Sequence, residues 1–394
     1  MKHRILVIGA GMFGVTAALE LKKRGHEVTL IDPGPLPHPE ASSTDISKVV
    51  RPDYGSEIFY AKLAQQCIDR WHEWNAEANQ ELYHETGYLV LAKEEMQPGG
   101  FEYESWKTLV SLDHPVEKLT SSDIINRFPG WSKGDYHHGY FNHRAGWVES
   151  GNVVSWLLSR VRDSGVHLVE GQKMVGLLEN GSRISGVVTD SKEEHFAEVV
   201  VVATGAWTPI LLPWLSDSLR CVGQPVYHFL IPDLESYKPE RFPAWSADIT
   251  NTGWYGLPAL PDGTLKVAHH GAGIPMDPRS EKIVPLENDQ KFCDFLKSTF
   301  DGLANSPILE RRLCLYCDSW DGDFLIGRDP DHEGLIVASG GSGHGFKFAP
   351  MLGQITADVV EGIDNPWASR FRWRTPGKAK TSPERYRLEI PETS

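Results

Sequence analysis

The chain has 394 residues, 40% of them hydrophobic and 23% charged, a composition typical of a globular protein large enough for two domains. Its formal net charge of -14 argues against nucleic acid or an anionic membrane as a partner, because both attract basic surfaces. Five cysteines, no apolar run of membrane-spanning length and no signal-peptide cleavage site together favour the reducing cytoplasm.

The N-terminal segment predicts a strand, a glycine-rich turn, a helix and a second strand. RILVI (residues 4–8) has the apolar run of a buried strand, the turn GAGMFG (residues 9–14) follows, and a helical pattern continues to about Arg24. HEVTLID (residues 26–32) then supplies a strand that ends in Asp32. This context is the one that the G-x-G-x-x-G fingerprint of dinucleotide-binding proteins requires.

Each feature of this segment has a physical role in holding a dinucleotide. Gly9 permits the tight turn, Gly11 lets the backbone approach a pyrophosphate, and Gly14 lets the helix pack closely on the strand. The helix N-terminus offers N–H groups and a partial positive charge to phosphate, and Asp32 can accept hydrogen bonds from a ribose. The segment therefore predicts a dinucleotide site, and it does not distinguish NAD from FAD.

The middle of the chain alternates strands and helices and then becomes rich in strands. Strands are predicted at residues 86–92 and 165–171, and a helix is predicted over residues 153–161. Residues 221–270 show β-like apolar patterns separated by Pro, Asp and Gly turns. Because nucleotide-type elements lie on both sides of this region, the domains are expected to be discontinuous in sequence.

Two later segments place glycines where a backbone could approach a bound nucleotide. VVVATGAW (residues 200–207) predicts a buried strand running into Gly205, although a plain strand and turn fits the pattern equally well. SGGSGHGFKFAP (residues 339–350) predicts a glycine loop that leads into a helix N-terminus, which could stabilise negative charge on a cofactor. A solvent loop is the alternative, and two phenylalanines argue against it. The loop includes Gly341, Gly343 and Gly345.

Two cysteines, Cys314 and Cys317, stand close together in RRLCLYCDSWDGDF (residues 311–324). Such a pair can bind zinc, carry out dithiol chemistry, be joined to a cofactor through one sulfur, or be inert. A zinc site needs two further ligands, and no second C-x-x-C occurs in the sequence, so no metal site is predicted. The thioredoxin-like context of a redox pair is also missing. The residues alone favour an inert pair, with a tether as the alternative.

Three motifs taken together resemble the monomeric sarcosine oxidase family of FAD-dependent amine oxidases. They are ILVIGAGMFG (residues 5–14), CLYCDSWDGDFLIGRDP (residues 314–330) and ASGGSGHGFKFAP (residues 338–350), and they occur in the family's order. That family also contains pipecolate, N-methyltryptophan and fructosyl amino acid oxidases. The resemblance implies an α/β fold with a Rossmann-type FAD-binding domain and a β-rich, α+β substrate domain.

The implied domains interleave along the chain. The FAD-binding domain would take residues 1–85, 146–216 and 314–365, and the substrate domain would take residues 86–145 and 217–313. Residues 366–394 are rich in arginine and lysine and poor in aliphatic residues, so they are expected to form a solvated tail.

The resemblance also implies roles for single residues at the cofactor. In the family, the cysteine that matches Cys314 forms a thioether to the 8α-methyl carbon of the flavin, whereas Cys317 is a departure and not a second tether. Lys266 matches the lysine near flavin N5 that promotes reaction with O2, because a fixed cation stabilises superoxide. Without the resemblance, Lys266 on an alternating strand would be expected to face solvent.

Further matches concern the substrate. Arg51 and Lys347 match the basic pair that holds the substrate carboxylate, a role that suits a guanidinium and an ammonium; each would otherwise be a surface charge. His270 matches an active-site histidine, and Tyr255 and Tyr316 match tyrosines that line the substrate pocket.

The segment ASSTDISKVVR (residues 41–51) departs from the sarcosine oxidase pattern. Thr44 and Lys48 stand where sarcosine oxidases tend to carry histidine and arginine. The Asp-Ile-Ser-Lys form is instead similar to the Asp-x-Asn-Lys of fructosyl amino acid and saccharopine oxidases. Lys48 would then lie over the flavin as a cation, and the identity of the substrate stays open.

We therefore expect FAD, joined covalently through Cys314, and oxidation of the C–N bond of a secondary amine such as an N-methyl, cyclic or fructosyl amino acid. The imine would hydrolyse, and O2 would be reduced to H2O2. The expected partners are this amine and O2, and the chain is expected to be a monomer or a weak homo-oligomer. Two alternatives stay open: a dehydrogenase that passes electrons to another acceptor, and a non-catalytic flavin or nucleotide sensor.

Overall fold

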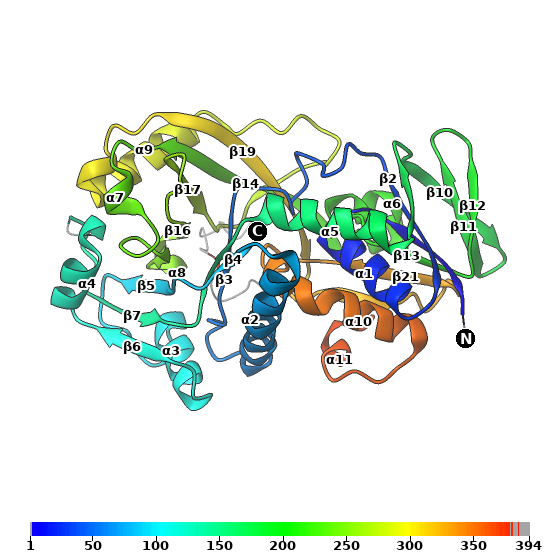
Figure 1. The fold of residues 1–394 in the computed structure, drawn as a ribbon, viewed down its shortest axis with the longest axis horizontal. Coiled ribbons are helices and arrows are strands. Elements are labelled where there is room, and N and C mark those ends of the chain that lie inside the picture. Colours follow the sequence, from blue (N-terminus) through cyan, green and yellow to red (C-terminus); the bar gives the residue numbers. More distant parts are fainter. Residues whose placement is uncertain (1, 132, 379, 381–384, 386–394) are drawn as a thin grey trace, which may run out of the picture.

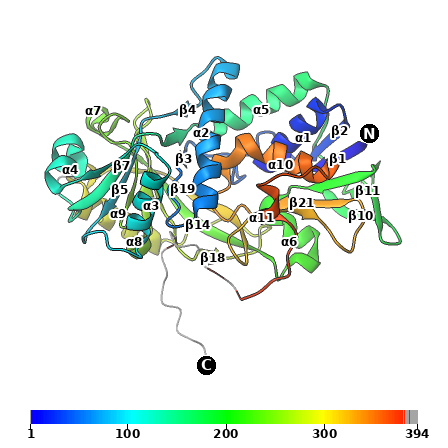
Figure 2. The ribbon, with the colours of Figure 1, turned by 90° about the horizontal axis from the view of Figure 1, so that it is seen from below.

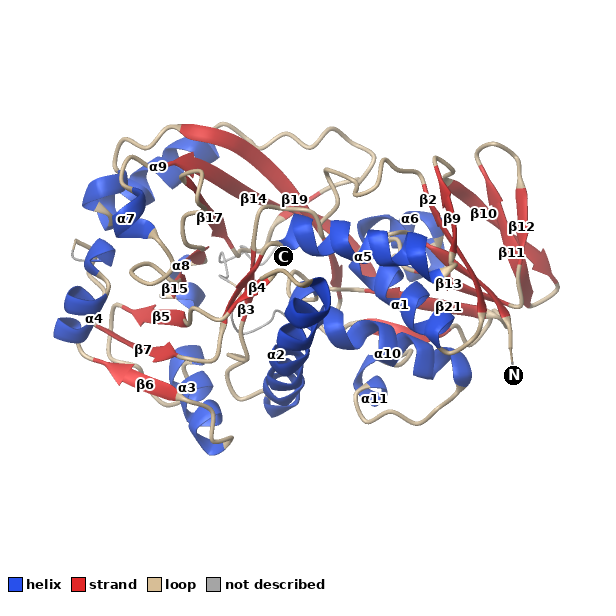
Figure 3. Ribbon diagram, viewed as in Figure 1, coloured by secondary structure: helices blue, strands red, loops and turns tan. Residues whose placement is uncertain are grey.

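In the computed structural model, residues 2–131, 133–378, 380 and 385 are described. They form two large sheets at opposite ends of an elongated molecule, with helices packed around each sheet (Figures 1 and 3). Two long strands, β14 (Leu219–Leu230) and β19 (Ile308–Ser319), run between these ends. Seen from below (Figure 2), both strands lie between the two groups of helices. Among the described helices, none is long and apolar enough to span a membrane.

The first sheet has six strands in the order β20-β21-β13-β1-β2-β9, all parallel except β20. Helices cover one face, and a small sheet of β10, β11 and β12 with helix α6 lies on the other, so the central strands are apolar on both sides. The strands of the first sheet are β1 (Arg4–Ile8), β2 (Glu27–Asp32), β9 (His167–Glu170), β13 (Val199–Val202), β20 (Leu325–Arg328) and β21 (Leu335–Ser339). Those of the small sheet are β10 (Met174–Asn180), β11 (Arg183–Thr189) and β12 (Glu194–Phe196).

The second sheet has nine strands, is mainly antiparallel, and encloses an aromatic core with the helices at its end of the molecule. Strand β14 pairs with β19 on one side and with β17 on the other. Besides β14 and β19, its strands are β5 (Tyr88–Ala92), β6 (Val116–Leu119), β7 (His138–Asn142), β15 (Ala244–Ala247), β16 (Trp254–Gly256), β17 (Thr264–His269) and β18 (Ile274–Pro275). Strands β3 (Lys48–Val50), β4 (Tyr83–His84) and β8 (Gly146–Val148) form a short sheet between the two.

The helices of the first sheet's end are α1 (Met12–Lys23), α2 (Ile58–Ala78), α5 (Ser150–Ser164), α6 (Thr208–Leu211), α10 (Ala349–Glu361) and α11 (Ala368–Phe371). Those of the second are α3 (Phe101–Ser111), α4 (Ser121–Arg127), α7 (Leu234–Tyr237), α8 (Ile249–Thr252) and α9 (Glu287–Thr299). The predicted α/β class is confirmed, as are the predicted strand–turn–helix–strand at the N-terminus and the helix over residues 153–161. The sequence reasoning did not predict α2, α9 or the small sheet.

The strands of the two large sheets come from alternating stretches of the chain: residues 4–32, 167–202 and 325–339 build the first sheet, and residues 88–142 and 219–319 build the second. The predicted boundary at residue 314 falls inside β19, which pairs with β14 as far as Leu219 opposite Ser319. Cys314 is therefore part of the second sheet, opposite Gln224, although its strand ends beside the first sheet. Cys314, the predicted point of attachment for the cofactor, thus lies on a strand that runs between the two large sheets.

The expectation of a solvated tail is wrong for its first residues. Phe371 is completely buried in the core of the first sheet's end. The Arg370 guanidinium lies 2.6 Å from Asp323, and Arg374 lies 2.5 Å from Asp321. These ion pairs hold the start of the segment against the body of the protein, although the Arg370 side chain itself is 38% exposed.

Candidate active site

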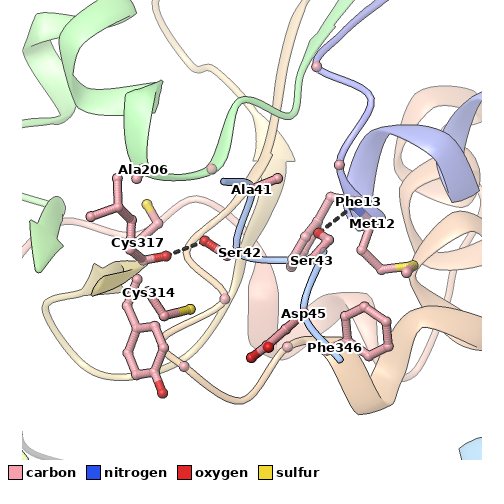
Figure 4. A pocket seen from close by; sticks show the side chains of 18 of the residues that line it. Met12, Phe13, Ala41, Ser42, Ser43, Asp45, Ala206, Cys314, Cys317 and Phe346 are labelled. Carbon is pink, nitrogen blue, oxygen red and sulfur yellow. Dashed lines mark hydrogen bonds between the residues drawn. The ribbon is translucent and has the colours of Figure 1, made fainter. Parts of the chain in front are cut away.

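A cavity of about 320 Å³ lies between the two sheets (Figure 4). Segments from distant parts of the chain line it: the turn after β1, the loop from His38 to Arg51, residues 203–207, strands β16, β17 and β19, and the loop 341–347. The cavity therefore forms only when both ends of the chain meet.

The glycines of the turn after β1 differ in what surrounds them. At Gly14 a Cβ would lie 1.8 Å from the Gly9 carbonyl oxygen, and at Gly9, where φ is +99°, it would lie 2.7 Å from the Ala203 oxygen. At Gly11 the nearest atom would be the Ser43 Oγ, at 3.6 Å. Gly9 and Gly14 are thus required by packing, whereas Gly11 leaves open space at the N-terminus of α1.

Asp32 lies at the edge of the cavity, at the carboxyl end of β2. Its Oδ2 accepts a hydrogen bond from the Ala10 N–H at 2.7 Å, and its Oδ1 accepts one from the Gly34 N–H at 2.8 Å. The carboxylate therefore fixes the turn after β1, and its remaining lone pairs stay available to a ligand.

The loop 341–347 approaches the cavity from the other side. At Gly343, where φ is +76°, a Cβ would lie 2.3 Å from the Tyr316 ring. At Gly341 and Gly345 it would lie 3.4 Å and 3.3 Å from the Phe13 ring. The glycines therefore let the loop pass between two aromatic rings, most strictly at Gly343.

Lys266 is buried, with 3% of its surface exposed, and it forms an ion pair with Asp45 at 2.5 Å. Its ammonium also donates to the Ser47 carbonyl oxygen at 2.6 Å. Burial alone would raise the pKa of Asp45, but the charge of Lys266 and a hydrogen bond with His228 hold that pKa well below its usual range. The solvent-facing position expected for Lys266 from its strand pattern alone is wrong, because β17 is buried on both faces.

Arg51 and Lys347 are also buried, with 7% and 6% of their surface exposed, and both line the cavity. Their cationic groups lie 5.4 Å and 5.2 Å from the centre of the Tyr54 ring. Arg51 donates to the Asp53 carbonyl oxygen, and the Lys347 ammonium donates to the Tyr54 hydroxyl at 2.9 Å. Two cations from distant segments are thereby held against one aromatic ring.

Three rings form an aromatic wall of the cavity. The His270 ring lies 6.4 Å from that of Tyr255 and 6.1 Å from that of Tyr316, measured between centres. Burial, followed by the charges of Arg385 and Arg51, lowers the pKa of His270 well below its usual range. His270 is therefore neutral at neutral pH. Burial likewise raises the pKa of both tyrosines, so their hydroxyls keep their protons.

Cys314 and Cys317 line the cavity at separate points (Figure 4). Both are buried, and neither is in a disulfide. The Lys48 ammonium lies in the same cavity, 5.7 Å from the centre of the Phe346 ring, and burial lowers its pKa. Thr44, the other departure noted in this segment, turns away and donates its hydroxyl to backbone carbonyls of its own loop. In the part of the chain that the structure describes, no cluster of three His, Cys, Asp or Glu has the arrangement of metal ligands.

The structure brings nearly all the predicted site residues together, and their individual roles stay predictions. Those that line the cavity are Gly9, Gly11, Asp32, Lys48, Arg51, Gly205, Tyr255, Lys266, His270, Cys314, Tyr316, Gly341, Gly343, Gly345 and Lys347. Gly14 does not line it, which agrees with its predicted role in packing the helix on the strand.

Sequence reasoning missed three residues of the site. Asp45 received no role, although it stands in the Asp-Ile-Ser-Lys segment and a buried lysine needs a counter-charge. Ser43 accepts a hydrogen bond from the Met12 N–H at 3.1 Å, at the N-terminus of α1 (Figure 4). Tyr54 holds the two cations described above. No pattern within the sequence identifies Ser43 or Tyr54, because their partners are remote.

Comparison with known proteins places this cavity in context. The profile of the FAD dependent oxidoreductase family matches residues 4–359. Monomeric sarcosine oxidase from Bacillus sp. is 26% identical over 364 residues, which cover 90% of this chain and 91% of that protein. L-saccharopine oxidase from Schizosaccharomyces pombe is 27% identical over 421 residues, which cover 96% of this chain and 95% of that protein.

Solved structures show the same fold. The deglycating enzyme fructosamine oxidase (Amadoriase II) from Aspergillus fumigatus matches with a TM-score of 0.86 and 23% identity, over 98% of this chain and 94% of that one. The family match extends from β1 to α10 and includes every segment that lines the cavity. The chain therefore belongs to the FAD dependent oxidoreductase family.

Proposed function

We propose that this protein is an oxidase of secondary amines, acting on N-substituted amino acids and using dioxygen as the electron acceptor. The observation that carries the proposal is that one cavity holds both a pair of cations and a separate third cation. Arg51 and Lys347 lie together against Tyr54, and Lys266 lies on β17 among the other lining residues. The first pair suits a carboxylate substrate, and the second cation suits the reduction of oxygen.

The residues present fit FAD. Gly11 leaves room where a pyrophosphate would approach the N-terminus of α1, and at Gly205, where φ is +53°, a Cβ would meet no atom within 4 Å. Asp32 would hold the ribose. When bound, FAD would accept two electrons from the C–N bond of the amine and deliver them to dioxygen.

The substrate would be held by its carboxylate and its amine. Arg51 and Lys347 would bind the carboxylate, because both cations are buried and face the cavity. His270 is neutral and can therefore accept a hydrogen bond from the amine N–H. The rings of Tyr255 and Tyr316 would bound the N-substituent and exclude water.

Lys266 would act on oxygen, as its match to the family's oxygen-activating lysine implies. One-electron reduction of dioxygen creates an anion, and a fixed cation in a buried site lowers that barrier. Lys266 also supports an oxidase over a dehydrogenase, because electron transfer to a dye or a quinone does not form superoxide and so does not need this cation.

We further propose that Cys314 carries the flavin as an 8α-thioether. Cys314 shares the cavity-facing side of β19 with Tyr316. A thioether withdraws electrons relative to a methyl group, so it would raise the reduction potential of the flavin and favour amine oxidation.

The class of substrate follows from what the relatives are named for. Sarcosine, L-saccharopine and fructosamine oxidases act on amines whose nitrogen carries a second carbon substituent, from a methyl group to a sugar. The test is a panel of sarcosine, N-methyltryptophan, pipecolate, saccharopine and fructosyl amino acids, scored by peroxide.

Peroxide formed with one member of the panel supports the proposal. Reduction of a dye by substrate without peroxide in air would instead identify a dehydrogenase. If no amine bleaches the flavin under anaerobic conditions, the sensor alternative is favoured and the proposed activity is wrong.

A further inference from the structure

A row of charged side chains crosses three neighbouring strands beside the cavity. His228 on β14 stands directly opposite Lys266 on β17 and opposite Glu310 on β19. Directly opposite residues of antiparallel strands point to the same face, so the three side chains lie side by side. Asp45 completes the group, because its Oδ2 pairs with Lys266 and its Oδ1 lies 3.1 Å from the His228 Nε2.

Both ring nitrogens of His228 face carboxylate oxygens. Besides the Nε2 contact with Asp45, the Nδ1 lies 2.9 Å from the Glu310 Oε2. A neutral imidazole has one N–H and can donate to one carboxylate, whereas the imidazolium donates to both. The geometry therefore matches a positively charged His228, which is itself buried.

The charge of His228 decides the net charge next to Lys266. The buried pair of Lys266 and Asp45 is neutral by itself, so the aspartate cancels the field that the ammonium would exert on a small molecule in the cavity. An imidazolium on the far side of Asp45 leaves this buried group with one positive charge. The Glu310 side chain is 55% exposed, so solvent screens its charge.

Other charged groups face this cluster. Arg312 follows on β19, opposite Val226, and donates to the Pro39 and Ala41 carbonyl oxygens of the loop that carries Asp45. Lys48 on β3 is close enough for its charge to favour the ionised form of Asp45. Both are cations, so they add to the positive field and do not oppose the effect of His228.

We infer that His228 is a positioning residue for oxygen reduction: its imidazolium, held by Glu310, compensates Asp45 and leaves the positive field of Lys266 available to dioxygen. This inference rests on the proposed function. Reduction of dioxygen to H2O2 takes up two electrons from the reduced cofactor, which returns to its oxidised form, and two protons. His228 supplies none of these atoms, and it acts only on the first electron transfer, which creates superoxide.

The experiment measures flavin reoxidation without any amine. The FAD-loaded enzyme is photoreduced under anaerobic conditions and mixed with dissolved oxygen in a stopped-flow instrument. His228→Gln keeps a hydrogen-bond donor toward Asp45 but cannot become charged, and it is expected to slow reoxidation about tenfold. Glu310→Gln, a change at an exposed side chain, is expected to slow it to a smaller extent.

The matched control is the surface pair of His143 and Glu117, whose side chains are half exposed and lie 3.4 Å apart. His143→Gln and Glu117→Gln are expected to leave the rate unchanged. Equal rates in wild type and His228→Gln would overturn the inference.

A second readout does not depend on turnover. Nitrogen-15 NMR of the oxidised, histidine-labelled holoenzyme, with His228 assigned by the His228→Gln variant, should show both ring nitrogens protonated at neutral pH. A neutral tautomer there would overturn the inference. Failure of the wild type to be reoxidised by oxygen would instead overturn the proposed function, whatever the state of His228.

Discussion

Cys314 and Cys317 lie on opposite faces of β19, although only two residues separate them. Cys314 packs with Tyr316 and Val226 beside the cavity, whereas Cys317 packs with the core of the first sheet. The Cys317 Sγ lies 3.4 Å from the Ser339 Oγ, and burial raises the pKa of its thiol to about 11. Alternation along a strand thus gives the two thiols different surroundings, although both line the cavity, and the raised pKa of Cys317 disfavours its thiolate form.

Cys314→Ala should abolish covalent attachment of the flavin. Acid denaturation of the wild type should leave yellow flavin on the polypeptide, and a tryptic peptide that contains Cys314 should carry its mass. Cys314→Ala should release the flavin, and Cys317→Ala, the matched control, should retain it. If Cys317→Ala released the flavin and Cys314→Ala retained it, the flavin would be attached to Cys317. Release of the flavin from the wild type would mean that the cofactor is not covalently bound.

Gly11→Ala and Gly14→Ala should separate cofactor binding from folding. Gly11 has φ of -74° and its added Cβ would make only an ordinary contact, so Gly11→Ala should change the free energy of unfolding by less than about 1 kcal/mol. It should weaken FAD retention, because the methyl group fills the space beside α1. Gly14→Ala, with a Cβ 1.8 Å from a carbonyl oxygen, should destabilise the protein by about 3 kcal/mol or more.

Urea unfolding and flavin content of both variants measure the two effects. A Gly11→Ala protein that is as unstable as Gly14→Ala would contradict the assignment of Gly11 to the cofactor.

Lys266→Met should slow the reaction with oxygen and spare the reaction with the amine. Anaerobic flavin reduction should stay within about tenfold of wild type, and reoxidation should slow by about 100-fold, the scale of one lost charge-stabilising group. The aspartate keeps the His228 ring as a partner after the ammonium is removed, so Asp45 is not left as an uncompensated buried charge. Urea unfolding of Lys266→Met checks that the slower reoxidation does not come from a loss of stability. Equal slowing of both half-reactions would show that Lys266 has another role.

Arg51→Gln should weaken the binding of the substrate carboxylate. The loss of a bidentate, charge-assisted hydrogen-bond pair is expected to raise KM by about 10- to 100-fold for a carboxylate substrate. The control is the same amine without its carboxylate, for which wild type and variant should perform alike. If both amines lose activity equally, Arg51 supports the fold around Tyr54 and Tyr88 and does not bind the substrate.

The sequence predicted the parts of the fold that depend on local pattern. Residues 4–32 form the expected strand, turn, helix and strand, because their apolar periods and glycines act within a short stretch of chain. The pattern of β17 could not place Lys266, since burial of both faces depends on strands that are remote in sequence. Asp45 is 221 residues from Lys266, and no periodicity connects such residues.

The candidate site was predictable mainly where motifs resemble a family. Cys314 and Lys347 lie in motifs with several unusual residues, so their place in a cavity could be expected. Tyr54 and His228 contact residues that are remote in sequence, and only the three-dimensional structure reveals these contacts.

The order of strands in the first sheet has a consequence for biosynthesis. β1 pairs with β13, and β13 in turn pairs with β21, which is translated more than 300 residues after β1. A chain still on the ribosome would therefore carry the turn after β1 long before the loop 341–347 that closes the cavity. Because residues 341–347 line the cavity, the cavity is complete only after nearly the whole chain has emerged, and a chain stopped before Gly341 should accumulate without flavin and be open to proteolysis.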